Sequence, residues 1–183
     1  MSERTYALFG VVGPLVAYFF IGLSIILSPW FSWSTDALSD LGHSVKSDAA
    51  SLYNFGLLLA GFLLVIYSMT AFREHAKYTS RCLLVSALML ESVATFDEAY
   101  GSLHVVVSTL FFVSLGFSSM IYAVERKSVL VFLAFLIGLG SWILWWAGIY
   151  SAGVAVPETI SSVVTVLWVV SSAIKIYFEK TNH

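Results

Sequence analysis

Six apolar stretches, separated by short polar segments, dominate the pattern of hydrophobic and polar positions along this chain. They cover residues 6–28, 49–72, 82–96, 103–124, 128–150 and 157–177. A helix needs about 20 apolar residues to cross roughly 30 Å of hydrocarbon. The first stretch is longer than a signal-peptide core and is followed by no small-residue cleavage site, so we interpret it as a retained span. The pattern predicts an all-α, polytopic membrane protein, in which residues 1–183 form a single transmembrane domain, a six-transmembrane-helix bundle.

Composition supports a membrane protein and excludes several other classes. Hydrophobic residues make up 59% of the chain and charged residues 11%, whereas a soluble domain has roughly 25% charged residues. The net charge is −2 and no basic patch stands out, which argues against a nucleic-acid partner. The single cysteine, Cys82, excludes an internal disulfide and a zinc site made of cysteines. The expected partners are membrane lipids, with a second copy of the chain as a further candidate.

The basic residues predict the orientation, because positive charge accumulates on the cytoplasmic side of a membrane. On the proposed spans only Lys46 falls on one side. The other side has eight: Arg4, Arg73, Lys77, Arg81, Arg126, Lys127, Lys175 and Lys180. We therefore expect a multi-pass protein of the cell membrane with both termini in the cytoplasm.

Glu91 is the most unusual residue of the apolar stretches. It lies ten positions after Arg81 and seven before Glu98, which places it near the middle of the bilayer at about 1.5 Å per residue. A charge there costs about 2.5–3.5 kcal/mol, and such side chains usually face a partner or a wet cavity. Three interpretations stay open: a hydrogen-bonded glutamic acid that joins helices, a functional carboxylate in a cavity, and a tilted span that leaves Glu91 near the interface.

His104 begins the fourth stretch, with Ser108 one turn deeper on the same face. Asp97 and Glu98 precede it across a short turn that contains Gly101, so His104 is expected to come within reach of Glu98. A carboxylate and an imidazole can serve general acid–base catalysis or a metal site. They can equally form a plain structural salt bridge.

The first long polar loop and the start of the second span carry further candidates. Residues 34–42 predict one short helix at the membrane interface, with Gly42 in the left-handed position that ends it and with Leu38 and Leu41 toward lipid. Asp36 and Asp40 would be neighbours on that helix. Asn54 lies too deep in its span to cap it, so its amide needs a partner, either another helix or a cavity.

Two ordered motifs resemble a known family. Residues 37–42 (ALSDLG) are followed by residues 52–56 (LYNFG), and residues 96–104 (FDEAYGSLH) come later, followed by Ser108 and two phenylalanines. Over about residues 10–178 the chain resembles the prokaryotic membrane-protein family called domain of unknown function 998, and more distantly the FRAG–DRAM–SFK group of six-helix proteins. In that family the second motif usually has a proline where this chain has Asp97. The resemblance implies six helices and no established reaction. It points to Ser39, Asp40, Gly42, Asn54, Glu98 and His104, whereas Glu91 is not one of the motif positions.

Three functions remain open from sequence, and they differ in what the polar residues do. The first is an outward-facing site that binds or processes a lipid or other amphiphile in the outer leaflet. The second is a non-catalytic interaction or lipid-organising module, and the third is a small transporter that uses Glu91. The sequence identifies no cofactor, metal or substrate, and it does not decide whether the protein is an enzyme. The candidate polar site consists of Ser39, Asp40, Asn54, Glu91, Glu98, His104 and Ser108.

Overall fold

The protein is a bundle of helices, seen in a computed structural model that describes residues 3–179. The all-α prediction is confirmed for these residues, which contain no β-strand. The elements in chain order are α1 (Glu3–Ala7), α2 (Phe9–Leu27), the 3-10 helix η1 (Leu38–Gly42), α3 (Ala50–Met69), α4 (Ala71–His75), α5 (Lys77–Thr95), the 3-10 helix η2 (Glu98–Tyr100), α6 (Ser102–Glu125), α7 (Val129–Trp146) and α8 (Ala155–Glu179).

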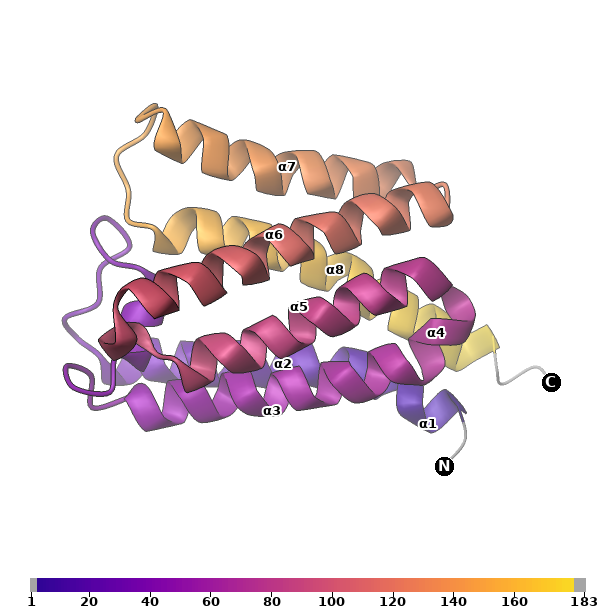
Figure 1. Cartoon of the computed structure of the whole chain (residues 1–183), viewed down its shortest axis with the longest axis horizontal. Helices are drawn as coiled ribbons and strands as arrows, with labels where there is room; N and C mark the ends of the chain where they lie inside the picture. The colour runs from indigo at the N-terminus through magenta and orange to yellow at the C-terminus, as the bar shows by residue number, and fades with distance from the viewer. Residues whose placement is uncertain (1–2, 180–183) are drawn as a thin grey trace.

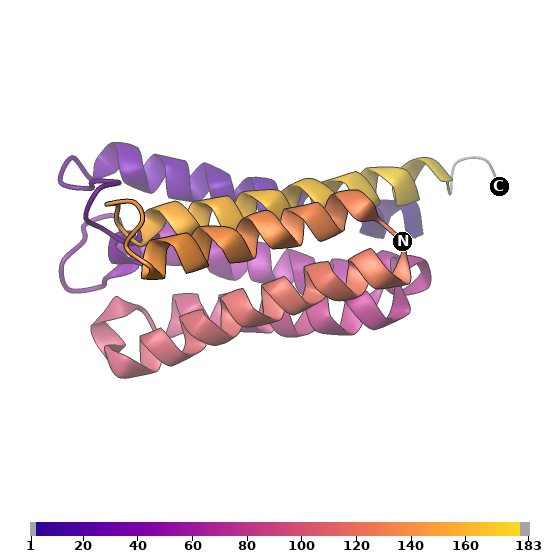
Figure 2. The same ribbon diagram turned by 90° about the horizontal axis from the view of Figure 1, so that it is seen from above.

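Six long helices, α2, α3, α5, α6, α7 and α8, run along the bundle (Figure 1, Figure 2). Within residues 3–179, five helical segments are long and apolar enough to cross a membrane: α3, α6, α7, α8 and the segment Arg4–Leu27, which combines α2 with most of α1. The sixth, α5, has the length but is more polar, because it carries Lys77, Arg81 and Glu91. The chain is therefore a multi-pass membrane protein, but the predicted count of six spans is not exact.

Several helix boundaries differ from the predicted spans for identifiable reasons. Helix α5 begins at Lys77 rather than at residue 82, because the Glu125 carboxylate accepts the backbone N–H groups of Tyr78 at 3.0 Å and Thr79 at 2.8 Å. These donors would otherwise be unsatisfied in the first turn. Helix α7 ends at Trp146 rather than at residue 150, and Gly148 follows with a positive φ of 65° that takes the chain out of the helix.

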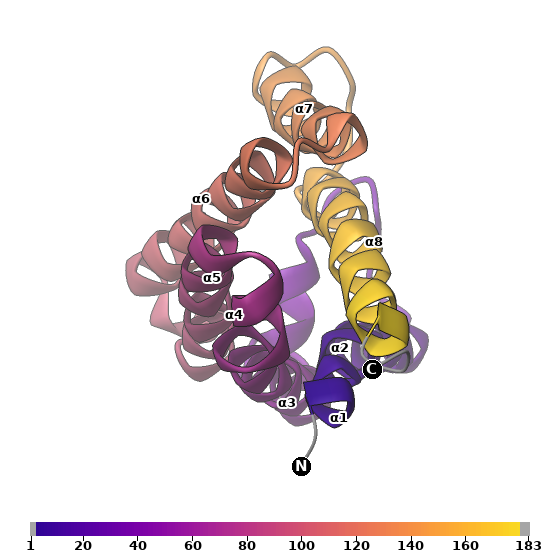
Figure 3. The ribbon, with the colours of Figure 1, turned by 90° about the vertical axis from the view of Figure 1, so that its right-hand side faces the viewer.

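The long helices form a ring when the bundle is viewed from its end (Figure 3). Helix α3 packs against α2 and α5, and α5 packs against α6. Helix α7 packs on α6 and α8, and α8 returns to α2 and closes the ring. The side chain of Arg4 donates to the hydroxyl of Tyr177 at 2.8 Å, so the first and last described helices meet at one end. We call this the terminal end, and the opposite end, which carries η1 and η2, the η1 end.

Lys and Arg residues are distributed unequally between the two ends of the bundle. Lys46 lies in the loop at the η1 end, between η1 and α3. The other basic residues of the described chain belong to α1, α4, the start of α5, the α6–α7 turn and the end of α8, all at the terminal end (Figure 1). Lys180, which was counted with them from sequence, lies outside the described residues.

The first loop folds down into the bundle. The predicted interfacial helix over residues 34–42 is wrong in extent, because only Leu38–Gly42 is helical and it is a 3-10 helix. Leu38 is 7% exposed and Leu41 is fully buried, and both belong to the hydrophobic core at the η1 end rather than facing lipid. Gly42 does not have a positive φ, so its predicted left-handed conformation is also wrong. The loop therefore forms one wall of the bundle interior.

Candidate functional site

The turn between α5 and α6 brings Glu98 and His104 into contact, as the short sequence separation predicts. His104 Nε2 lies 3.0 Å from Glu98 Oε2, and His104 Nδ1 lies 2.8 Å from the carbonyl oxygen of Phe96. A carbonyl oxygen only accepts hydrogen bonds, so Nδ1 carries a proton. Nε2 and the carboxyl group then share one further proton, as an ion pair or as a neutral pair. The His104 side chain is 4% exposed and the Glu98 side chain 30%, so solvent reaches the pair from the carboxylate side.

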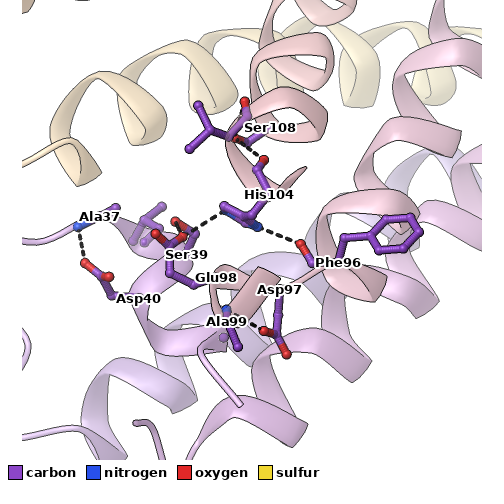
Figure 4. Close-up of polar contacts among 12 residues, drawn as sticks. Ala37, Ser39, Asp40, Phe96, Asp97, Glu98, Ala99, His104 and Ser108 are labelled. Carbon is purple, nitrogen blue, oxygen red and sulfur yellow. Dashed lines mark hydrogen bonds and ion pairs between the residues drawn. The ribbon is translucent and has the colours of Figure 1, made fainter. Parts of the chain in front are cut away.

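Ser39 connects this pair to η1 (Figure 4). Its hydroxyl donates to the same carboxylate oxygen, Glu98 Oε2, at 3.1 Å. Glu98 therefore lies between the serine hydroxyl and the imidazole. In a serine nucleophile the hydroxyl donates to the imidazole instead. The Ser39 hydroxyl is therefore not arranged as an activated nucleophile, because it donates to Glu98 and not to His104.

Asp40 and Asn54 belong to the same end of the bundle but make other bonds. Asp40 Oδ2 accepts the N–H of Ala37 at 2.8 Å and so caps η1, and Figure 4 shows its carboxylate directed at Ala37. Asn54 Nδ2 donates to the carbonyl oxygen of Gly42 at 2.9 Å and ties η1 to α3. Ser39, Glu98 and His104 are therefore bonded together, while Asp40 and Asn54 bond to the backbone of the first loop and hold it in place.

Ser108 lies on the same helix face as His104, one turn farther along α6. Its hydroxyl donates to the carbonyl oxygens of His104 at 2.8 Å and Val105 at 3.2 Å, within its own helix. It makes no bond to Glu98 among the described residues, but it lines the cavity described below.

Glu91 lies apart from this group. Its side chain packs against Gly61 of α3, where a Cβ atom would come within 2.6 Å of Glu91 Cγ. It is partly buried, and its backbone carbonyl accepts the hydroxyl of Thr95 at 2.7 Å. Glu91 is absent from the residues that line the cavity. The structure places it in the α3–α5 contact and does not bring it to the other candidates.

Glu158 is a buried carboxyl group that the sequence interpretation missed. It lies in the first turn of α8, is 7% exposed, and accepts the backbone N–H of Leu38 through Oε2 at 2.7 Å. In the sequence it is one more acid at the start of an apolar stretch, where a carboxylate suits the positive end of the helix dipole. Its partner lies 120 residues away, so no local pattern indicates that it turns inward.

A cavity of about 110 Å³ lies inside the ring of helices, below η1. Its lining is mainly apolar and comes from α2, η1, α3, α5, α6 and α8. On α3 it extends from Tyr53 to Leu64, which is about 16 Å along the helix axis. Ser39, Tyr53 and Glu158 lie at its η1 end, whereas Glu98 and His104 do not line it. The cavity is therefore long and narrow, with a polar end.

The Tyr53 side chain is 5% exposed and lines the cavity, yet its hydroxyl has no hydrogen-bond partner among the described residues. Glu158, Glu98 and Asp40 lie within electrostatic reach of it. No group of three or more His, Cys, Asp or Glu side chains within residues 3–179 is placed to hold a metal ion. The polar end of the cavity thus offers carboxyl and hydroxyl groups.

The comparisons with known proteins identify a family without assigning a reaction. No curated protein and no solved structure matches the chain. A family model described as "Protein of unknown function (DUF998)" matches residues 11–175. This range includes both motifs and every candidate site residue. The distant likeness to the FRAG–DRAM–SFK group has no support beyond the sequence resemblance. The chain belongs to the DUF998 family of membrane proteins of unknown function.

Proposed function

We propose that this protein binds a single-chain amphiphile, with the alkyl chain in the cavity and the polar end beneath η1. The observation that carries the proposal is the cavity itself, which is mainly apolar along its length and polar at one end. The volume of about 110 Å³ is smaller than the roughly 150 Å³ of a cavity that takes up benzene, so an alkyl chain must push the lining side chains apart. The lining follows α3 for about 16 Å, and this long, narrow shape suits one chain better than a two-chain lipid.

Binding rather than chemistry is the better-supported role of the polar residues. The pair of Glu98 and His104 lies outside the cavity lining, and the Ser39 hydroxyl that does line it donates its proton to Glu98. In this proposal the pair holds η1 over the end of the cavity. A transporter that uses Glu91 has less support, because that side chain packs against Gly61 and not in the cavity. If no amphiphile binds, the remaining candidate function is a non-catalytic interaction or lipid-organising module.

A cavity-filling substitution tests the proposal. Ala87 of α5 lines the cavity and is 1% exposed, so Ala87→Leu adds side-chain volume where the alkyl chain would lie. Ala134 of α7 does not line the cavity, and Ala134→Leu adds the same volume elsewhere. The proteins should be purified in a detergent with a rigid steroid tail, because an alkyl detergent would compete for the site. Bound dodecanol is then counted by native mass spectrometry.

We expect dodecanol to bind to the wild-type protein and to Ala134→Leu, and to be lost from Ala87→Leu. Thermal unfolding shows whether each variant is folded; if Ala87→Leu is not, Ala60→Val fills the same cavity from α3 with a smaller change. Equal dodecanol binding by wild type and a folded cavity-filling variant would contradict the proposal.

We further propose that the protein lies in the cell membrane with the terminal end in the cytoplasm. The support is the charge distribution: of the Lys and Arg residues in the described chain, only Lys46 lies at the η1 end. The test is cysteine labelling in intact cells on a Cys82→Ser background. Val45→Cys, at a loop residue that is 82% exposed, should react with an impermeant reagent, and Lys127→Cys should not. The reverse pattern would refute this orientation.

A further inference from the structure

We propose that the amphiphile bound in the cavity carries an amine, which pairs with Glu158 and is hydrogen-bonded by Tyr53. This inference rests on the proposed function and adds the chemical class of the head group. It follows from three features of the η1 end: an unpartnered hydroxyl, a buried carboxyl group without a cation, and the sign of the surrounding charges.

The hydroxyl of Tyr53 is the first feature. Tyr53 is 5% exposed and lines the cavity, and its hydroxyl has no hydrogen-bond partner among the described residues. The hydroxyl oxygen is not among the buried, unpartnered side-chain atoms of the described residues, so it is accessible from the cavity. A polar ligand group at this end of the cavity would provide the missing partner.

Glu158 is the second feature. Among the described residues the Glu158 carboxyl group accepts one hydrogen bond, from the Leu38 N–H to Oε2, and the residue also lines the cavity. The ion pairs of the described residues are His104 with Glu98 and Lys175 with Glu179, so neither involves Glu158. An acidic group inside a membrane protein usually pairs with a cation or marks a ligand site. A ligand ammonium group at the cavity end would fill this role.

The surrounding charge is the third feature, and it selects among head groups. Asp40 and Glu98 lie within electrostatic reach of Glu158. The imidazole of His104 lies at the same end of the bundle, but Glu98 already engages it. No Lys or Arg of the described residues lines the cavity, so a carboxylate or phosphate head group would meet the Glu158 carboxyl group without a cation to pair with. A hydroxyl head group would gain hydrogen bonds only, whereas an ammonium group would gain charge-assisted ones.

A series of ligands with one chain and three head groups tests the inference. Dodecylamine, dodecanol and dodecanoate are titrated against the full-length protein in the steroid-tail detergent, with native mass spectrometry as the readout. We expect dodecylamine to bind about tenfold or more tightly than dodecanol, as a charge-assisted hydrogen bond would give. Dodecanoate should bind most weakly.

Two variants, each lacking one acidic group, distinguish a direct contact between the amine and Glu158 from a long-range effect of negative charge. Glu158→Gln should lower the affinity for dodecylamine to about that for dodecanol, because it removes the charge but keeps a polar side chain of similar size. Asp48→Asn is the matched control: Asp48 is an exposed acid at the same end and does not line the cavity. It should leave the preference for the amine unchanged.

The outcomes distinguish this inference from the proposed function. Equal binding of dodecylamine and dodecanol, or stronger binding of dodecanoate, overturns the amine and leaves the cavity site intact. An equal loss of preference in Asp48→Asn and Glu158→Gln also overturns it, because the effect would then be long-range. Absence of binding by all three ligands overturns the proposed function itself. If Glu158→Gln does not fold, Tyr53→Phe takes its place and should weaken the binding of both dodecylamine and dodecanol.

Discussion

Gly42 is the position where the docking of η1 on α3 can be tested most sharply. A Cβ atom on Gly42 would lie 2.6 Å from Asn54 Oδ1 and 2.8 Å from Tyr53 Cδ1, so both side chains would have to move. Overpacking of this kind costs about 1–3 kcal/mol. Displacing Asn54 also breaks its hydrogen bond to the Gly42 carbonyl, which contributes about 0.5–1.5 kcal/mol. We therefore expect Gly42→Ala to destabilise the protein by about 2–4 kcal/mol.

The assay is reversible unfolding in detergent, followed by tryptophan fluorescence. Gly140→Ala in α7 is the control, because nothing lies within 4 Å of its added Cβ and alanine favours a helix by about 0.5–1 kcal/mol over glycine. Asn54→Ala should cost less in the Gly42→Ala background than in the wild type, since the two changes act on one contact. Wild-type stability of Gly42→Ala, or strictly additive effects, would refute the reasoning.

Three further predictions concern the contacts at the two ends of the bundle. His104→Ala should cost about 1–3 kcal/mol of unfolding free energy, because it leaves the Phe96 carbonyl and Glu98 without their partner, while Ser108→Ala should stay within about 0.5 kcal/mol in the same assay. Glu125→Ala should cost about 1–2 kcal/mol, because the start of α5 loses its cap, and Glu125→Gln should cost less because it keeps an acceptor; equal loss in the two variants would contradict the cap. Burial, and then the charge of Arg126, lower the pKa of the His75 imidazole to about 4, below its usual 6.5, so the unfolded chain binds this proton more readily than the folded one. Stability should therefore be complete above about pH 6.5 and decline as the pH falls toward 4, and His75→Gln should lack this component of the slope.

The helices were largely predictable because a chain that crosses lipid must satisfy its backbone bonds within each segment. An apolar stretch that is long enough to span the bilayer is therefore expected to form an α-helix. Where the prediction failed, the cause was a contact from far away in the chain. The start of α5 depends on a hydrogen bond from Thr79 to Glu125, which lies 46 residues farther along the chain. The hydrophobic pattern within α5 does not indicate this contact.

The candidate site was predictable only where its residues are close in sequence. Glu98 and His104 meet across a short turn, so their pairing followed from spacing. The hydrogen bond that Asp40 accepts from the Ala37 N–H was not predicted, because it depends on the 3-10 turn that η1 takes. Glu158 was not predicted as a site residue, because its contact with Leu38 depends on the packing of the last helix, α8, against the first loop.

The most direct test of the account is to find where a bound alkyl chain lies. An amphiphile with a photoreactive diazirine at the end of its chain is bound to the protein in the steroid-tail detergent and irradiated, and the labelled residues are mapped by mass spectrometry. We predict labels on residues that line the cavity, such as Leu57 of α3, Leu90 of α5 and Val169 of α8. Labels confined to lipid-facing positions of α7, such as Leu133, which is 47% exposed, would show that the chain lies outside the bundle and would contradict the account.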